Sequence, residues 1–212
     1  MPEDSLNGAD ILLFTPHRSS IPLANKAHPV TRQTHLSKFL SYVLRHSPDR
    51  VGLELDRGGW VAIDELLTAN AAQGRVISRA KLDQVVADND KQRFAISADG
   101  QRIRASQGHS TPVDLGYAPT LPPAMLYHGT ALPHLPGIRR HGLVKGRRHH
   151  VHLSGDEATA HAVGQRHGRG VVLKVCSGEM AHAGFTFYRS ANGVWLTDAV
   201  PYRYLVEPDP LD

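Results

Sequence analysis

A proline-rich segment divides this 212-residue sequence into two stretches with different hydrophobic patterns. Residues 110–123 (STPVDLGYAPTLPP) contain four prolines and little helical periodicity. Proline lacks an amide hydrogen and fixes φ, so such a segment rarely continues a helix or a central strand. We therefore predict a linker at 110–123 between folded units at 34–109 and 124–207. A poorly ordered leader at 1–33 and a short tail at 208–212 complete the expected organisation.

The stretch before the linker has a helical pattern and then a hairpin pattern. Apolar residues at positions 36, 39, 40, 43 and 44 follow the spacing of an amphipathic helix, which Thr34 is placed to cap. Further elements are expected as helices at 63–72 and 78–88 and as strands at 94–96 and 103–105. Asp99-Gly100 forms the turn between the two strands. Three helices followed by a β-hairpin are typical of a winged-helix module, a common nucleic-acid-binding scaffold.

The stretch after the linker alternates short strands with helices. Strands are expected at 126–128, 151–153, 171–176, 186–188, 194–197 and 204–206. Residues 154–157 (SGDE) have the spacing of a capping box, which predicts a helix over 156–167. We expect Ala158, Ala162 and Val163 on its inner face. The fold class is therefore α+β.

Positive charge is concentrated in the second half of the chain. Residues 125–170 contain seven Lys or Arg, two acidic residues and eight of the fourteen histidines. This excess suits a polyanionic partner, either a nucleic acid or a pyrophosphate group, although a solvated basic face explains it equally well.

The single cysteine and the short apolar runs exclude several classes of protein. Cys176 cannot form an intramolecular disulfide or a cysteine-based zinc site, and its apolar neighbours predict a buried structural thiol. The apolar runs are too short to span a bilayer. We therefore expect a cytoplasmic protein with no membrane partner.

Two positions in the first half are candidates for chemistry. Arg45 and His46 end the first helix, because Ser47 precedes a proline and is pushed out of the helical region. Such a pair commonly only complements the helix dipole, but it is also suited to holding a phosphate and moving a proton. Arg93 borders the strand at 94–96, where the fold would fix its guanidinium; an exposed arginine is the simpler interpretation.

The second half contains two histidine motifs. His128, Gly129 and Thr130 end a strand, where ligands commonly bind. His150, His152 and Ser154 alternate onto one face of another strand, where they can line a cleft beside His128. The histidine pair also has the spacing of zinc ligands, but no nearby cysteine or convincing carboxylate completes a closed site, so we expect no metal. The chain has neither a Walker A motif nor a GxGxxG motif. Trp195 is expected in the core.

Seven segments occur in an order that resembles the RNA 2′-phosphotransferase family. They are 37–46 (SKFLSYVLRH), 56–60 (DRGGW), 90–94 (DKQRF), 103–110 (IRASQGHS), 126–130 (LYHGT), 150–154 (HVHLS) and 192–197 (NGVWLT). The family comprises the bacterial relatives of the enzyme that finishes tRNA splicing in fungi. The resemblance extends from about residue 34 to residue 207.

The resemblance implies a fold and a set of site residues. It implies an N-terminal winged-helix lobe that binds RNA and a C-terminal ADP-ribosyltransferase-like lobe that binds NAD. The implied catalytic residues are Arg45, His46, Arg93 and Arg148, with the adjacent Arg147 as the alternative to the last. The implied NAD-binding residues are His128, Gly129, Thr130, His152 and Ser154. The glutamate of protein-modifying ADP-ribosyltransferases has no counterpart near Val194, which is typical of the phosphotransferases.

The implied reaction consumes NAD as a co-substrate and uses no metal. The RNA 2′-phosphate displaces nicotinamide to form an ADP-ribosylated RNA phosphate, and the ribose 2″-hydroxyl then releases RNA with a free 2′-hydroxyl and ADP-ribose 1″,2″-cyclic phosphate. We expect a monomer whose partners are RNA carrying a 2′-phosphate and NAD. Two alternatives remain: ADP-ribosylation of other phosphorylated nucleic-acid ends, and a non-catalytic winged-helix regulator.

Overall fold

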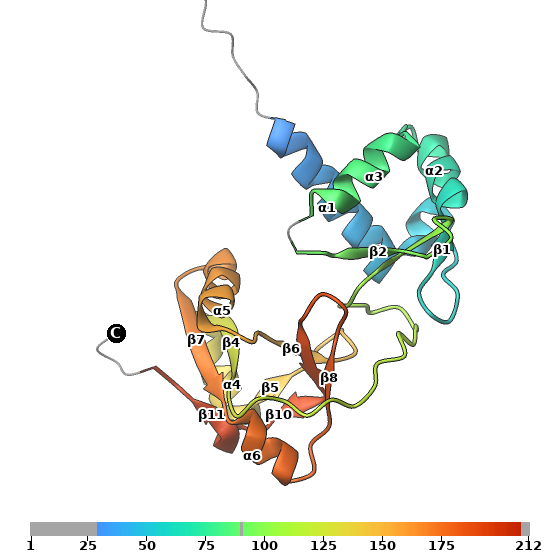
Figure 1. Ribbon diagram of the computed structural model, residues 1–212. Helices are drawn as coiled ribbons and strands as arrows, with labels where there is room; N and C mark the ends of the chain where they lie inside the picture. The colour runs from blue at the N-terminus through green and yellow to red at the C-terminus, as the bar shows by residue number, and fades with distance from the viewer. Residues whose placement is uncertain (1–28, 90, 209–212) are drawn as a thin grey trace, which may run out of the picture.

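The computed structural model describes residues 29–89 and 91–208, and its elements form two groups along the chain (Figure 1). One hydrophobic cluster draws its residues from 36–105 and a second from 126–205. Helices and antiparallel sheets occur in both groups, so the structure is a mixed α and β fold, as predicted. None of the helices in the described part of the chain has both the length and the apolar character needed to cross a membrane.

The N-terminal group combines helices with one small sheet. Its elements are α1 (Pro29–His46), the 3₁₀ turn η1 (Pro48–Val51), β1 (Val61–Ala62), α2 (Ile63–Ala72), α3 (Arg79–Ala87), β2 (Phe94–Ile96) and β3 (Arg102–Ala105). The sheet order is β1-β3-β2, and the predicted hairpin is confirmed with Phe94 opposite Ala105. The Ser78 hydroxyl accepts a hydrogen bond from the Lys81 amide at 3.2 Å and caps α3.

The first helix starts earlier than the sequence predicts. Leu40, Val43 and Leu44 are fully buried, which confirms the expected apolar stripe. However, α1 begins at Pro29, so the prediction of Thr34 as its cap is wrong. Proline fits the first turn of a helix, because the amides there have no intrahelical acceptor. Residues 1–28 of the expected leader and 209–212 of the expected tail lie outside the described residues.

The C-terminal group contains three small antiparallel sheets in the order β11-β7-β4, β6-β9-β8 and β10-β5. Its strands are β4 (Leu126–Ala131), β5 (Leu143–Val144), β6 (Val151–Leu153), β7 (Gly170–Val175), β8 (Phe187–Arg189), β9 (Trp195–Thr197), β10 (Ala199–Val200) and β11 (Leu205–Val206). Its helices are α4 (Leu135–His141), α5 (Glu157–Gly164) and α6 (Ser177–His182), with 3₁₀ turns η2 (Leu132–His134), η3 (Gln165–His167) and η4 (Tyr202–Tyr204). All six predicted strands are present. The unpredicted elements, α4, α6, β5 and β10, are too short to show periodicity.

Helix α5 differs from its prediction in its cap and its inner face. The Asp156 carboxylate, and not Ser154, caps the helix by accepting a hydrogen bond from the Thr159 amide at 2.7 Å. The buried residues are Ala160 and Gly164, whereas Ala158 and Ala162 are exposed. The inner face is set by how closely α5 approaches β4: a side chain at Gly129 would collide with the carbonyl of Ala160. Small size, and not hydrophobicity, selects this face.

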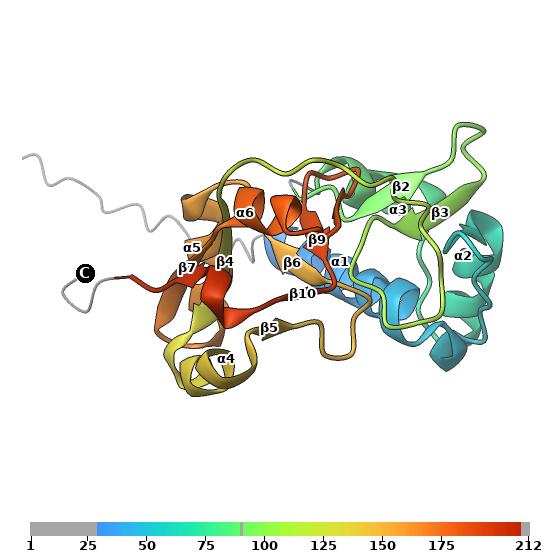
Figure 2. The ribbon, with the colours of Figure 1, turned by 90° about the horizontal axis from the view of Figure 1, so that it is seen from below.

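The linker at 110–123 is hydrogen-bonded to both groups. The Asp114 amide donates to the Arg57 carbonyl at 2.7 Å, and the Thr120 amide donates to the Phe187 carbonyl at 2.8 Å. A direct contact joins the groups as well, because Asn192 Nδ2 donates to the Lys91 carbonyl at 2.9 Å. In Figure 1, α1 runs downward, so its carboxyl end is on the side of the N-terminal group that faces the C-terminal group; Figure 2 shows the same two groups from below. The candidate site lies where these parts meet.

Candidate active site

Arg45 sits at the carboxyl end of α1 with part of its guanidinium buried. Its Nε and Nη2 atoms are shielded from solvent and have no hydrogen-bond partner among the described residues. Burial lowers the pKa of Arg45 to about 10, and the positive charges of Arg93 and Arg148 contribute to this shift. Buried donors without a partner are costly, and a negatively charged ligand would satisfy them. The surroundings of Arg45 therefore suit the binding of an anion.

His46 is the last residue of α1, and a residue outside the helix orients its ring. His46 Nδ1 lies 2.9 Å from the Ser110 hydroxyl, so this hydrogen bond uses Nδ1 and not the second ring nitrogen, Nε2. Burial is the largest cause of the lowered pKa of His46, and the charges of Arg45 and Arg148 add to it. The ring is therefore mostly neutral near pH 7, a state in which one nitrogen can accept a proton while the N–H of the other donates a hydrogen bond.

The segment that leads into the linker fixes the end of α1. The amides of Ser110 and Thr111 donate to the Arg45 carbonyl at 2.9 and 3.3 Å, and the Thr111 hydroxyl donates to the same oxygen at 3.3 Å. Gly108 lies between two site residues, since a Cβ there would stand 3.7 Å from both Arg45 Nη1 and His152 Nε2. The connection between the two groups is thus part of the site and not only a tether.

Arg93 directly precedes β2, and its side chain is half-buried. This burial agrees with the expectation that the fold holds its guanidinium in place. Its Nη1 donates to Asn89 Oδ1 at 3.3 Å, and Asn89 Nδ2 donates to the Ser37 hydroxyl at 2.9 Å. Asn89 is itself only 7 % exposed. The interpretation of Arg93 as a freely exposed surface arginine is therefore wrong. Its charge also lies close enough to Arg45 to lower the pKa of that residue.

Of the two adjacent arginines, Arg148 is the one that contacts a second site residue. Arg148 Nη1 lies 3.5 Å from His152 Nδ1. The charge of Arg148 lowers the pKa of both Arg45 and His46, whereas Arg147 affects only His46 and is the smallest of its causes. The Arg148 side chain is exposed, so it borders the site from the solvent side.

His152 and His128 lie on neighbouring strands and are both neutral. Burial lowers the pKa of His152 to about 3, with the charges of Arg148 and Arg45 as further causes. Its Nε2 is buried and has no partner among the described residues. His128 Nδ1 donates to the His152 carbonyl at 3.1 Å, which fixes its tautomer, and burial lowers the pKa of His128.

Gly129 and Thr130 have structural partners within the C-terminal group. Gly129 makes room for the carbonyl of Ala160 on α5. Thr130 is buried, and its hydroxyl lies 3.3 Å from His134 Nδ1. The close approach that the glycine permits is therefore that of a helix, and the NAD-binding roles of both residues stay predictions.

Strand β6 presents its side chains as the alternation predicts. Val151 and Leu153 are buried in the core, while His152 and Ser154 are only partly buried. The Ser154 amide and carbonyl exchange hydrogen bonds with the backbone of Tyr127 at 2.8 and 3.0 Å. This bridge joins β6 to β4 and brings the two histidine motifs side by side.

The metal, cysteine and tryptophan predictions have different outcomes. Within the part of the chain that the structure describes, no group of three or more His, Cys, Asp or Glu is arranged to hold a metal ion. Cys176 is half-buried instead of fully buried, and burial raises the pKa of its thiol. Trp195 is buried in the core, as predicted.

Sequence reasoning missed three residues that shape the site: Asn89, His109 and Ser110. Asn89 follows α3, and a polar residue at the end of a helix is usually interpreted as a cap. The sequence therefore gives no sign that Asn89 contacts Arg93. His109 is 1 % exposed, and neither ring nitrogen has a partner among the described residues. The only signal for His109 and Ser110 is their place in the segment 103–110, which belongs to the resemblance.

Partnerless donors of Arg45, further arginines and a neutral histidine are the kind of side chains that an enzyme acting on an anionic group requires. Residues 31–199 match the family model described as RNA 2′-phosphotransferase, Tpt1 / KptA family. A protein from Pseudomonas aeruginosa named "Probable RNA 2′-phosphotransferase" is 56 % identical over 172 residues, which is 81 % of this chain and 94 % of that protein. Proteins of the same name from Trichormus variabilis and Streptomyces griseus are 56 % and 54 % identical over 174 and 182 residues, covering 82 % of this chain and 96 % of each relative.

These likenesses establish the family. The chain belongs to the RNA 2′-phosphotransferase family, and it is an enzyme of the transferase class.

Proposed function

We propose that the protein is an NAD-dependent transferase that removes an internal 2′-phosphate from RNA. The observation that carries this proposal is the cluster of cations around Arg45. Two buried guanidinium nitrogens there have no partner among the described residues, and the charges of Arg93 and Arg148 lie close by. The membership of the chain in the RNA 2′-phosphotransferase family supports RNA as the source of that anion.

A phosphomonoester is the anion that suits this site best. Its second pKa is about 6, so it is largely dianionic at pH 7 and is already a competent nucleophile. It therefore needs charge neutralisation and alignment more than activation by a carboxylate. Arginines supply both through paired N–H donors. This requirement explains why a family with such a substrate can lack the glutamate of other ADP-ribosyltransferases.

We assign NAD to the residues on β4 and β6. His128, Gly129 and Thr130 would line one side, and His152 with Ser154 the other. The nicotinamide ring of NAD is cationic, so neutral imidazoles suit it better than protonated ones, and burial keeps His128 and His152 neutral. His152 also carries a buried nitrogen without a partner in the described chain, which a ligand can satisfy.

The reaction would proceed in two steps. In the first, an oxygen of the RNA 2′-phosphate attacks C1″ of the nicotinamide ribose, and the bond from C1″ to nicotinamide breaks. In the second, the adjacent ribose 2″-hydroxyl attacks phosphorus, and the bond from phosphorus to the RNA 2′-oxygen breaks. The products are nicotinamide, RNA with a 2′-hydroxyl and ADP-ribose 1″,2″-cyclic phosphate.

The arginines and His46 would act mainly in the second step. Negative charge develops there on the phosphorus oxygens, which Arg45, Arg93 and Arg148 would stabilise. A proton must also leave the attacking 2″-hydroxyl, and one must reach the departing RNA 2′-oxygen. His46 is the candidate for both transfers: Nε2 of the neutral ring would take up the first proton and then pass it to the leaving oxygen, because Nδ1 is held by Ser110.

The two halves of the chain would divide the substrates between them. We assign residues 34–109 as a winged-helix lobe that binds RNA, residues 110–123 as a linker, and residues 124–207 as an ADP-ribosyltransferase-like lobe that binds NAD. The three helices and three-stranded sheet of the first group support the former assignment. A monomeric state and a cytoplasmic location are also expected.

Incubation with a 2′-phosphorylated oligoribonucleotide, with and without NAD, tests the proposal. We expect nicotinamide release and a 2′-hydroxyl product only with NAD, and the same rate in EDTA. A stalled RNA–ADP-ribose adduct in the wild-type enzyme would instead favour ADP-ribosylation of phosphorylated ends. Duplex DNA binding with a steep salt dependence and no nicotinamide release would favour the regulator.

A further inference from the structure

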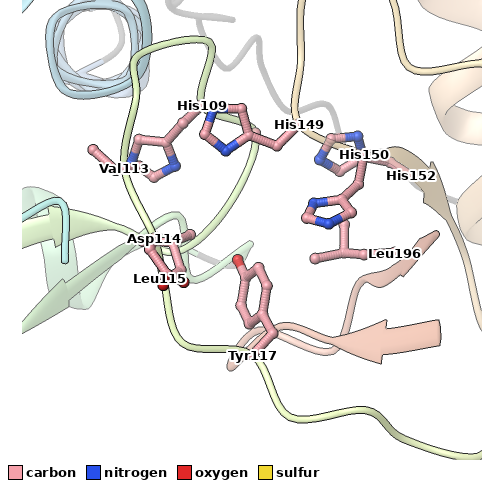
Figure 3. Close-up of a pocket in the computed structure, with 10 residues that line it drawn as sticks. His109, Val113, Asp114, Leu115, Tyr117, His149, His150, His152 and Leu196 are labelled. Atoms are coloured by element: carbon pink, nitrogen blue, oxygen red, sulfur yellow. The ribbon is translucent and has the colours of Figure 1, made fainter. Parts of the chain in front are cut away.

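A small cavity lies beside the anion site, between the linker and the β6-β9-β8 sheet (Figure 3). Its volume is about 150 Å³. Linker residues, including Leu115 and Tyr117, form one wall, and His150, His152 and Leu196 form the facing wall. Pockets that enclose a drug-sized ligand measure roughly 300–1,000 Å³, so this cavity holds one ring system and not a whole dinucleotide.

The cavity lies on the far side of β6 from β4, one of the two strands to which we assign NAD. None of its lining residues comes from β4, and His152 is the one assigned NAD residue that also lines the cavity. In the sheet, His152 lies opposite Leu196, and Leu196 lies opposite Tyr188, so these three side chains form a row on one face. Strand β4 joins β6 on the other side, away from β9 and β8, through the backbone of Ser154. His152 on β6 therefore stands between β4 and the cavity.

The cavity is continuous with the arginine site. Gly108 and His152 both line the cavity. They lie next to each other, because a Cβ added to Gly108 would stand 3.7 Å from His152 Nε2. Arg45 Nη1 lies equally close to that position, at 3.7 Å. A phosphate on Arg45 and a ring in the cavity would thus lie on neighbouring sides of Gly108. This is the arrangement of a phosphate and a base in one stretch of RNA.

Aromatic rings line the cavity and its far edge. The Tyr117 and His150 ring centroids are 6.2 Å apart, and those of His150 and Tyr188 are 5.4 Å apart, both with edge-to-face geometry. The Tyr117 ring is fixed, because its hydroxyl donates to the Ser106 carbonyl at 2.7 Å. Fixed aromatic rings are surfaces on which single-stranded bases stack, whatever the base.

His109 provides polar groups that no part of the described protein satisfies. It lines the cavity, is 1 % exposed and has both ring nitrogens buried without a partner among the described residues. Burial lowers its pKa to about 3, so the ring is neutral at pH 7. A neutral imidazole has one donor and one acceptor, and the edge of a nucleobase also presents both kinds of group.

We propose that this cavity binds one unstacked nucleobase of the RNA substrate, from the 2′-phosphorylated nucleotide or an immediate neighbour. The inference rests on the proposed function, because it takes the RNA 2′-phosphate as the anion on Arg45. Binding of this kind requires the base to leave its helix, which selects single-stranded segments and loops over paired RNA. Since stacking tolerates every base, little sequence preference is expected.

Abasic substitution combined with Tyr117→Ala tests the proposal. The substrates are a 2′-phosphorylated oligoribonucleotide and three copies of it, each lacking the base at one of the three candidate nucleotides. At saturating NAD we expect one abasic position to lower the wild-type kcat/KM about 10-fold or more, the usual scale of base stacking. Tyr117→Ala should lose a similar factor on the intact substrate and nothing further on that abasic one.

Controls separate this inference from its alternatives. Tyr117→Phe keeps the ring and loses only the hydrogen bond to Ser106, so it should retain the abasic penalty that Tyr117→Ala abolishes. Tyr202→Ala, which removes an exposed tyrosine of η4, should stay near wild type. If no abasic position affects the wild-type enzyme, the proposal is wrong, and this arm does not depend on the folding of any variant. If Tyr117→Ala raises the KM for NAD and leaves the abasic penalty intact, the cavity binds the nicotinamide ring instead. Failure of the proposed function itself would appear differently, as no NAD-dependent removal of the 2′-phosphate by the wild-type enzyme.

Discussion

Two arginines in different regions of this protein have opposite surroundings. At the edge of the C-terminal group, Arg139 is exposed and makes two hydrogen bonds to the Glu207 carboxylate, at 2.7 and 2.6 Å. At the junction of the two groups, Arg45 is partly buried, and two of its nitrogens have no partner among the described residues. The first side chain is satisfied by the fold, and we propose that a ligand satisfies the second. On this proposal, the difference separates a cation that serves structure from one that serves function.

Replacing the two arginines should have opposite effects, and this is the largest effect we expect. Arg45→Met should lower kcat by roughly 10²–10³, the usual loss when one donor to a transition-state anion is removed. The variant should not unfold at a lower Tm, because it removes a buried charge that has no carboxylate partner. Arg139→Met, the matched control, should keep its activity and lose a little stability. Steady-state kinetics and thermal unfolding of both variants check the contrast. A drop in Tm for Arg45→Met without loss of activity would contradict it.

The adjacent pair Arg148 and Arg147 offers a second contrast between neighbouring cations. Arg148→Ala should slow the second step by roughly 10²-fold, because it removes a cation beside the developing phosphorus charge. The ADP-ribosylated RNA should therefore accumulate. Arg147→Ala should turn over near the wild-type rate without accumulation. Gel analysis of labelled RNA in single-turnover reactions distinguishes them, and the reverse pattern would assign the catalytic role to Arg147.

Loss of the hydrogen bond between Ser110 and His46 should have a moderate effect. A typical hydrogen bond contributes roughly 0.5–1.5 kcal/mol, so Ser110→Ala should lower kcat by up to about 10-fold. The KM for RNA should stay unchanged, since the hydroxyl orients His46 and does not bind substrate. Ser110→Thr should restore kcat, and Thr111→Val serves as the control for loss of a nearby hydroxyl. If kcat falls only in proportion to a fall in Tm in all three variants, the Ser110 hydroxyl has a purely structural role.

The buried histidine His109 should make stability depend on pH. Its folded-state pKa is about 3, below the value near 6.5 of an unfolded chain, so protons bind the unfolded state more readily. Its contribution is complete above about pH 6.5 and falls as the pH drops toward 3, by about 1.4 kcal/mol per unit. His109→Leu should therefore lose less stability between pH 7 and pH 5 than the wild type. The exposed-site control His141→Gln should match the wild type, and denaturant titrations at both pH values measure the difference. A wild-type stability that does not fall between these pH values would contradict the prediction.

The sequence was most informative where local pattern decides the structure. The apolar stripe of α1, the full extent of α2 and the hairpin of β2 and β3 follow from periodicity and turn residues. The inner face of α5 does not, because close backbone packing against Gly129 outweighs hydrophobicity. The start of α1 at Pro29 was also missed, since the pattern sharpens only after Thr34.

The sequence predicted the cationic residues of the candidate site, but not the residues that hold them in position. Pro48 ends α1 and places Arg45 and His46 at its carboxyl end, which the sequence indicates. The resemblance, and not local physics, pointed to Arg148. The roles of Asn89 and Ser110 depend on contacts between distant segments: Asn89 bonds Ser37, 52 residues away, and Ser110 bonds His46, 64 residues away. No local pattern encodes such contacts.

The fate of the RNA phosphorus tests the central claim most directly. An oligoribonucleotide labelled with ³²P in its 2′-phosphate is incubated with the enzyme and NAD, and the labelled products are identified. Phosphate transfer predicts that the label moves into ADP-ribose 1″,2″-cyclic phosphate, in equal amount to the nicotinamide released. Label recovered as inorganic phosphate, or retained on RNA while nicotinamide is released, would contradict it.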